Sequence, residues 1–227
     1  MALIVPSLLA GDFARLGESL EVVQALGVPV VHIDVMDGHF RPEISAGQPV
    51  VRSIRGATQL GLEIHLLIER PERYIEDFVK AGADSLAFHN ESTRNPAAAI
   101  DSARKLGTRV GLALNATTPV EACFEVLEDI DFVLLEVGRG TWKPRSILRA
   151  AAFARQRKDR GLSFAIEVEG DFLAGEAEKL FAAGVDILVA GSAIFDKEEQ
   201  GERMRALART LSGRSSAPAQ ETRSPVH

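Results

Sequence analysis

Short apolar runs alternate along this chain with longer segments whose apolar residues recur at helical spacing. At four points a helical segment ends in a glycine-containing turn and an apolar run follows directly, and these turns lie at residues 25–29, 81–84, 106–108 and 183–186. Glycine after the last helical turn provides a left-handed C-cap, and an unbroken apolar run suits a strand buried on both faces. The pattern predicts repeated helix–turn–strand units around a parallel sheet.

Eight strands are predicted from the apolar runs, at residues 3–6, 30–33, 62–67, 85–88, 109–114, 132–137, 163–168 and 187–190. The first predicted helix carries the apolar stripe Phe13, Leu16, Leu20, Val23 and Leu26, and the last carries Met204, Leu207 and Leu211. Asp12 is the expected N-cap of the first helix, because a carboxylate there accepts the free amide hydrogens of the first turn.

Eight strands that alternate with helices in about 210 residues predict a parallel α/β fold, and eight units favour a single (β/α)8 TIM barrel. An open doubly wound sheet is the alternative. The first strand-to-helix turn, residues 7–12, lacks Gly-x-Gly-x-x-Gly, which weakens the dinucleotide-binding form of that alternative. The barrel domain is predicted to span residues 1–211. Residues 212–227 contain almost nothing that could be buried, which predicts a disordered tail.

Composition narrows the possible partners. The chain has 227 residues, 46% of them hydrophobic, which is enough for one sizeable core. Its 26 basic and 32 acidic residues give a net charge of -6, which argues against nucleic acid or an anionic membrane as the main partner. No apolar run has the length of a membrane span, and the first residues lack the features of a signal peptide. With Cys123 as the single cysteine, no intrachain disulfide can form, and the cytoplasm is the expected compartment.

Polar residues gather where the predicted strands end, which is where barrels of this type carry their chemistry. These residues are Ser7, His32, Asp34, His65, His89, Asn115, Glu167, Glu169, Gly191 and Ser192. Three of the five histidines end successive strands, and His39 follows just beyond one of them. Scattered core histidines would not fall in this order.

Two imidazoles and two carboxylates in this set are expected to face one axis. His32 and Asp34 are two residues apart on a strand, so their side chains leave the same face. His65 and Glu169 complete a nitrogen and oxygen donor set that suits one divalent ion such as Zn, Mn, Co or Fe. Simpler readings remain open: a capped strand end with a solvated Asp-Gly turn for His32 and Asp34, and a satisfied buried histidine for His65. A polar turn that hydrates the imidazole is the simpler reading for His89.

The chain resembles the ribulose-phosphate 3-epimerase family from about residue 6 to residue 195. The segments that carry the resemblance are residues 6–10, 12–16, 32–40, 65–68, 71–75, 113–115 and 189–195. Membership implies a (β/α)8 barrel that uses one divalent ion to invert the carbon next to the carbonyl of a ketose phosphate. It also implies a sugar phosphate as partner and a homo-oligomer.

The resemblance assigns roles to particular residues. His32, Asp34 and His65 match metal ligands, and Asp34 doubles as one acid/base group. Glu169 stands where the family has an Asp that is both a ligand and the other acid/base group. The positions that match the substrate pocket are Ser7, Met36 and His65, and those that match its phosphate site are Gly170, Gly191 and Ser192.

Two departures from the family pattern affect the active site. Glu169 and Asp171 replace an Asp and a Gly, so one acid is a methylene longer and a second negative charge lies near the expected phosphate. Residues 137–144 replace the Gly-rich loop after the sixth strand. Arg139, Lys143 and Arg145 could offset the added charge or form a solvated loop and helix start. Trp142 could face the sugar or pack under the loop.

Epimerisation requires two groups on opposite faces of the carbon, and Asp34 and Glu169 come from well-separated strands. The predicted function is therefore a metal-dependent epimerase that acts through an enediolate, with D-ribulose 5-phosphate to D-xylulose 5-phosphate as the default reaction. The alternatives are a sugar-phosphate isomerase or lyase that uses the same enediolate chemistry, and a non-catalytic barrel that binds a sugar phosphate.

Overall fold

A computed structural model of the chain describes residues 3–137 and 144–195. Its eight strands are parallel and form one sheet in the order β1-β8-β7-β6-β5-β4-β3-β2. The strands are β1 Leu3–Pro6, β2 Val30–Met36, β3 Gly61–Leu67, β4 Ser85–His89, β5 Arg109–Leu114, β6 Phe132–Glu136, β7 Ala165–Glu169 and β8 Ile187–Ala190. All eight predicted strands are present.

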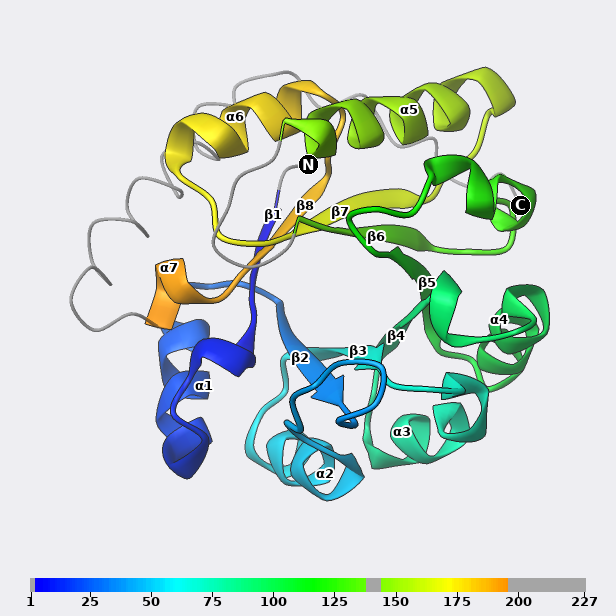
Figure 1. Cartoon of the computed structure of the whole chain (residues 1–227). Helices are drawn as coiled ribbons and strands as arrows, with labels where there is room; N and C mark the ends of the chain where they lie inside the picture. The colour runs from blue at the N-terminus through cyan, green and yellow to red at the C-terminus, as the bar shows by residue number, and fades with distance from the viewer. Residues whose placement is uncertain (1–2, 138–143, 196–227) are drawn as a thin grey trace, which may run out of the picture.

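The sheet curls into a barrel whose two ends meet at β1 and β2. A parallel bridge between Ser7 and His32 joins these two strands, and Figure 1 shows the strands as an inner ring with the helices outside it. This arrangement confirms the (β/α)8 barrel and excludes the open doubly wound sheet. The bridge also places Ser7 next to β2, where the candidate site begins.

Helices follow most of the strands around the outside of the ring. They are α1 Leu16–Ala25, α2 Gln48–Ala57, α3 Ile75–Ala81, α4 Pro96–Lys105, α5 Arg145–Arg160, α6 Ala174–Ala182 and the short α7 Ser192–Phe195. A 3-10 segment, Val120–Val126, follows β5 in place of an α-helix. The four predicted glycine turns are confirmed, because Gly27, Gly82, Gly107 and Gly184 all have positive φ angles.

The start of the first helix differs from the prediction. Asp12 accepts the amide hydrogen of Ala14 and caps a 3-10 turn, Phe13–Arg15, and α1 begins only after that turn. Leu20 and Val23 are buried, whereas Phe13 is 44% exposed and lines the cavity described below. Phe13 therefore does not belong to the buried face of α1 as predicted, because it precedes this helix and lines the cavity.

Apolar side chains fill the space between strands and helices, and a second, smaller cluster fills the barrel interior. The interior cluster contains Val5, Ala87, Ala113, Phe132, Leu134 and Val189. A Cβ on Gly111 would approach the Phe132 ring to 2.2 Å, so glycine in β5 provides the room for this ring to lie inside the barrel. Phe132 is the first residue of β6, so the apolar cluster includes the beginning of that strand.

Two strand ends differ from the predicted bounds in a way that matters for the site. β2 continues to Met36 and β7 runs to Glu169, so Asp34 and Glu169 are held within the sheet. The predicted last helix, the tail from residue 212, and Arg139, Trp142 and Lys143 lie outside the described residues. None of the helices that the structure describes combines the length and apolar character needed to cross a membrane.

Candidate metal centre and active site

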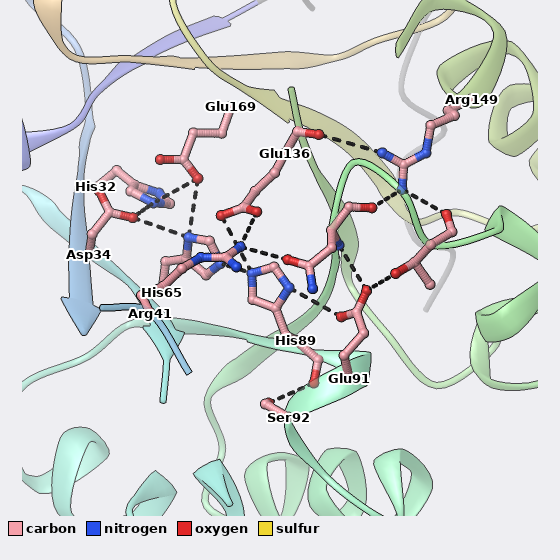
Figure 2. A network of polar contacts seen from close by, with 12 residues as sticks. His32, Asp34, Arg41, His65, His89, Glu91, Ser92, Glu136, Arg149 and Glu169 are labelled. Carbon is pink, nitrogen blue, oxygen red and sulfur yellow. Dashed lines mark hydrogen bonds and ion pairs between the residues drawn. The ribbon is translucent and has the colours of Figure 1, made fainter. Parts of the chain in front are cut away.

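Four side chains from three strands meet at the carboxyl end of the barrel, as Figure 2 shows. Asp34 Oδ1 lies 3.3 Å from His32 Nε2 and 3.1 Å from His65 Nδ1. Glu169 Oε2 lies 3.1 Å from His65 Nδ1 and 4.0 Å from His32 Nε2. The structure thus brings together all four residues expected to form a metal site, and both histidines are fully buried.

The donor atoms of this cluster fit a single ion. Ligands that bind one ion through nitrogen and oxygen at about 2.1 Å lie roughly 3 to 4 Å from one another. The observed separations between the donor atoms, 3.1 to 4.0 Å, fall in that range. Glu169 Oε2 is buried without an aligned hydrogen-bond donor although His65 Nδ1 is close. A cation would satisfy this oxygen, so the residues present are suited to a metal ion.

Protons hold the same cluster together when no cation is bound. Burial would lower the pKa of His65, but hydrogen bonds and charge from Asp34 and Glu169 raise it to about 9. The pKa of His32 is likewise raised, against the effect of burial, by Asp34 and Glu63. Burial would raise the pKa of Asp34, but both imidazoles hold it far below its ordinary value. Burial and the charge of Asp34 raise the pKa of Glu169.

We expect the metal-free protein to lose stability as the pH rises from about 6.5 through about 9. A pKa raised by folding stabilises the native state fully below the unfolded value of 6.5, and this stabilisation disappears above the folded value. For His65 the loss is at most roughly 3 kcal/mol. Urea unfolding of chelator-treated protein at pH 6 and pH 9.5 measures it. His65→Gln should flatten the slope, and an equal slope in that variant would contradict the assignment.

His32 and His65 each have a second ring nitrogen that points away from the other candidate ligands and lies close to a buried side chain. His32 Nδ1 lies 2.8 Å from Glu63 Oε1, and Glu63 comes from β3. Behind it, Glu167 is 1% exposed and lacks a hydrogen-bond donor among the described residues. Burial and the charge of Glu63 raise the pKa of Glu167 well above its ordinary value. Glu63 Oε1 is placed to accept the Nδ1 hydrogen of His32, which leaves Nε2 facing Asp34 and Glu169.

His65 is oriented by a different partner. Its Nε2 lies 3.0 Å from His89 Nε2, and His89 Nδ1 lies 3.2 Å from Glu91 Oε2. An imidazole that offers Nδ1 to a cation carries its hydrogen on Nε2, so His65 donates to His89 and His89 donates to Glu91. The structure therefore places His89 behind a candidate metal ligand, His65, rather than in a hydrated turn.

Replacing His89 with phenylalanine should weaken binding of a divalent cation by about 10- to 100-fold. The ring volume is kept, but His65 loses the acceptor that fixes its hydrogen on Nε2. Competition with a chromogenic chelator measures the affinity. His39→Phe is the matched control, because His39 is exposed and its Nδ1 lies 3.0 Å from the carbonyl oxygen of Asp37, away from the four clustered side chains. Equal affinities in the two variants would show that His89 does not orient the ligand.

A cavity of about 1040 Å³ opens above the cluster. Among its lining residues are seven of the predicted site residues, namely Ser7, Asp34, Met36, Glu169, Gly170, Gly191 and Ser192. Ser7 donates its hydroxyl hydrogen to Asp34 Oδ2 at 2.8 Å, so one oxygen of Asp34 faces the metal cluster and the other is held toward the cavity. His32 and His65 are fully buried and are not among the lining residues.

The cavity wall at the ends of β7 and β8 contains the glycine and serine positions expected to bind a phosphate. A Cβ on Gly191 would approach Ala10 Cβ to 2.9 Å, so this close packing requires glycine. Ser192 donates its hydroxyl hydrogen to Asp171 Oδ1, so the hydroxyl already has an acceptor. Arg145 is exposed at the start of α5 and does not line the cavity.

Sequence reasoning did not assign roles to Glu63, Glu136 and Arg41. Glu63 precedes His65 by two residues on β3, so alternation along a strand was a usable signal for a shared inward face. Glu136 ends β6 and lies 3.7 Å from His89 Nε2, and its position at a strand end was also a signal. The sequence contained no such signal for Arg41, because the position of this residue depends on how the loop after β2 folds.

Fold and site together define a (β/α)8 barrel enzyme with two carboxylates at a candidate metal centre. Residues 3–195 match the model of the Ribulose-phosphate 3 epimerase family, and the chain belongs to this family. It is an isomerase of the epimerase type. The ribulose-phosphate 3-epimerase of Treponema pallidum (strain Nichols) is 39% identical over 197 residues, which cover 85% of this chain and 90% of that protein. The enzyme of Bacillus subtilis (strain 168) is 38% identical over 213 residues, which cover 91% of this chain and 97% of that protein.

Solved structures show that the fold is shared more widely. KGPDC from Streptococcus mutans superposes with a TM-score of 0.69 at 14% identity and covers 94% of this chain and 98% of that one. Phosphoribosyl anthranilate isomerase from Thermus thermophilus superposes with a TM-score of 0.66 at 17% identity, and the match covers 94% of this chain and 99% of that one. At these identities the likeness concerns the fold alone.

Proposed function

We propose that this chain is a metal-dependent epimerase that inverts the carbon next to the carbonyl of a phosphorylated ketose, by default D-ribulose 5-phosphate to D-xylulose 5-phosphate. The observation that supports it most is the meeting of two carboxylates from non-adjacent strands at one imidazole. Asp34 of β2 and Glu169 of β7 each place an oxygen 3.1 Å from His65 Nδ1. Two acid/base groups that approach from different strands can serve opposite faces of one carbon.

The contacts of the residues support the roles that we propose for them. Asp34 and Glu169 exchange a proton with the two faces of the reacting carbon, and Ser7 holds Asp34 Oδ2 in position for that exchange. A divalent cation held by His32, Asp34, His65 and Glu169 would supply positive charge for the developing enediolate oxygens. The donor set suits Zn, Mn, Co or Fe. Met36, His65, Gly170, Gly191 and Ser192 remain proposed substrate-binding positions.

Metal analysis of the purified protein, followed by solvent deuterium exchange at C3 of D-ribulose 5-phosphate, tests this function. Bound metal with exchange supports epimerisation. Bound metal without exchange would point to another substrate or to isomerase or lyase chemistry. Absence of both would favour a barrel that binds a sugar phosphate without turnover.

We also propose a cytoplasmic location and self-association. The single cysteine, Cys123, is buried and unpaired, which suits a reducing compartment. Self-association is supported only by the family resemblance, and light scattering on the eluting protein would measure the oligomeric state.

A further inference from the structure

A carboxylate lies at the part of the cavity wall where the phosphate of the substrate is expected. Gly170, Gly191 and Ser192, the proposed phosphate-binding positions, line the cavity at the ends of β7 and β8, and the exposed Asp171 lines it beside them. At neutral pH a phosphate monoester carries a charge of about -1.5 to -2. A phosphate at this wall and the Asp171 carboxylate therefore repel each other.

The backbone holds Asp171 at this position. Just before it, the amide of Gly170 donates to the carbonyl oxygen of Val189 at 3.1 Å, which continues the pairing of β7 with β8. Just after it, Phe172 is 4% exposed and belongs to the main apolar core. Because the chain is fixed on both sides of Asp171, the carboxylate stays at the cavity wall when a ligand binds.

The same carboxylate occupies the hydroxyl donor of the phosphate site. Ser192 donates its hydroxyl hydrogen to Asp171 Oδ1. Ser192 follows Gly191, which packs so closely on the segment after β1 that a Cβ there would approach the Ala10 Cβ to 2.9 Å. A hydroxyl has one hydrogen, so Ser192 must leave Asp171 before it can donate to a phosphate oxygen. Binding a phosphate here therefore breaks a hydrogen bond in addition to opposing a charge.

The described part of the cavity wall supplies no cation to offset Asp171. Arg41 is the basic residue among the described lining residues, and its Nη2 donates to Glu136 Oε2 at the end of β6. Arg139 and Lys143, in the loop after β6, lie outside the described residues. Within residues 3–137 and 144–195, no basic side chain forms an ion pair with Asp171.

A neutral hydroxyl meets the opposite situation at this wall. A carboxylate has two oxygens with about four acceptor positions, so Asp171 can accept a second hydrogen while Ser192 stays on Oδ1. The terminal hydroxyl of an unphosphorylated ketose can supply that hydrogen. Hydrogen bonds to an ionised acceptor are about twice as strong as those between neutral groups. The side chain that opposes a phosphate therefore favours a terminal hydroxyl.

We propose that Asp171 is a specificity-determining residue of the phosphate site: it weakens binding of a phosphorylated terminus, accepts a terminal hydroxyl and thereby extends the substrate range to unphosphorylated ketoses. This inference rests on the proposed function, because it takes the reaction to be epimerisation of a ketose. The phosphate site remains at the ends of β7 and β8, and Asp171 determines how strongly that site prefers a phosphate. D-ribulose 5-phosphate and D-ribulose differ only in this group and measure the preference.

Asp171→Asn tests the proposal with these two substrates. We expect kcat/KM for D-ribulose 5-phosphate to rise by about tenfold, mostly through a lower KM, because a negative charge beside the phosphate is removed. For D-ribulose we expect a fall of about threefold, because a neutral acceptor replaces a charged one. Asp101→Asn removes the same charge from an exposed position on α4 and is the matched control. A fall for D-ribulose 5-phosphate, or an equal change for both substrates, would overturn the proposal.

Ser192→Ala, made alone and together with Asp171→Ala, tests the shared hydrogen bond. In the wild type the hydroxyl hydrogen belongs to Asp171, so its removal should change KM for D-ribulose 5-phosphate by less than about threefold. In Asp171→Ala the hydroxyl is free to donate to the phosphate, so its removal should raise KM by about tenfold. Equal effects of Ser192→Ala in the two backgrounds would contradict the proposal.

Equilibrium binding by calorimetry separates this inference from the proposed reaction. If the wild-type protein binds D-ribulose 5-phosphate without deuterium exchange at C3, the proposed reaction fails while the role of Asp171 can still be judged. Tighter binding of this compound to Asp171→Asn than to Asp101→Asn then supports the proposal. Unchanged or weaker binding to Asp171→Asn, or a wild-type protein that neither binds nor turns over D-ribulose, overturns it.

Discussion

Asparagine in place of Asp34 is expected to abolish solvent deuterium exchange at the reacting carbon while the barrel remains folded. The side chain has two separate tasks, because Oδ1 faces His32 and His65 and Oδ2 accepts the hydroxyl hydrogen of Ser7. Asparagine cannot take up a proton at either position. Removing a positioned acid/base group costs about 10²- to 10⁴-fold in rate, and here a ligand charge is lost as well. We expect a loss of at least about 10³-fold.

Metal content and circular dichroism must accompany this measurement, so that a lost cation or a lost fold is not mistaken for a lost base. Ser7→Ala is the matched variant. It removes the hydrogen bond to Oδ2 but leaves all four candidate ligands, so we expect a smaller loss of rate with unchanged metal content. If Asp34→Asn retains wild-type exchange with metal bound, the proton passes through another group and the proposed mechanism fails.

The barrel could be predicted because its determinants are local in the sequence. Glycine turns such as Gly82 and Gly184 mark where one unit ends, and their positive φ angles confirm the reason for glycine there. The metal cluster followed from the same logic, since strand ends in a parallel barrel converge on one axis. The positions of residues that strand geometry fixes, such as His32 and His65, could therefore be predicted from the sequence.

Other parts of the site depend on tertiary contacts that periodicity does not encode. Glu63 and Glu167 approach each other from β3 and β7 across the barrel interior, so their relation appears only when the ring closes. Arg41 reaches Glu136 over a sequence separation of 95 residues, through a loop whose path is set by hydrogen bonds of Asp37 and Ser45. Pairings of this kind are fixed by the fold.

Shortening Glu169 to aspartate is expected to lower the rate by about 10²-fold, although aspartate is the residue that the family resemblance places here. The backbone at this position lies within the sheet: Glu169 pairs with Glu136 of β6 and with Val189 of β8. Its carbonyl oxygen accepts the amide hydrogen of Val137 at 3.0 Å. A strand held on both sides cannot advance to compensate for a lost methylene, so the carboxylate would withdraw from His65 by about 1 Å or more, a displacement that can cost about 10²-fold.

Glu169→Gln distinguishes the effect of side-chain length from the effect of the ionisable carboxyl group. Glutamine keeps the length but cannot exchange the proton, so we expect it to be slower than the aspartate variant, with a loss of about 10³-fold in kcat. Single-turnover exchange with metal content measured in parallel ranks the three proteins. If the aspartate variant equals or exceeds the wild type, β7 already lies where the shorter acid would suffice. The extra methylene would then be dispensable for proton transfer. Wild-type exchange in Glu169→Gln, by contrast, would mean that Asp34 needs a different partner.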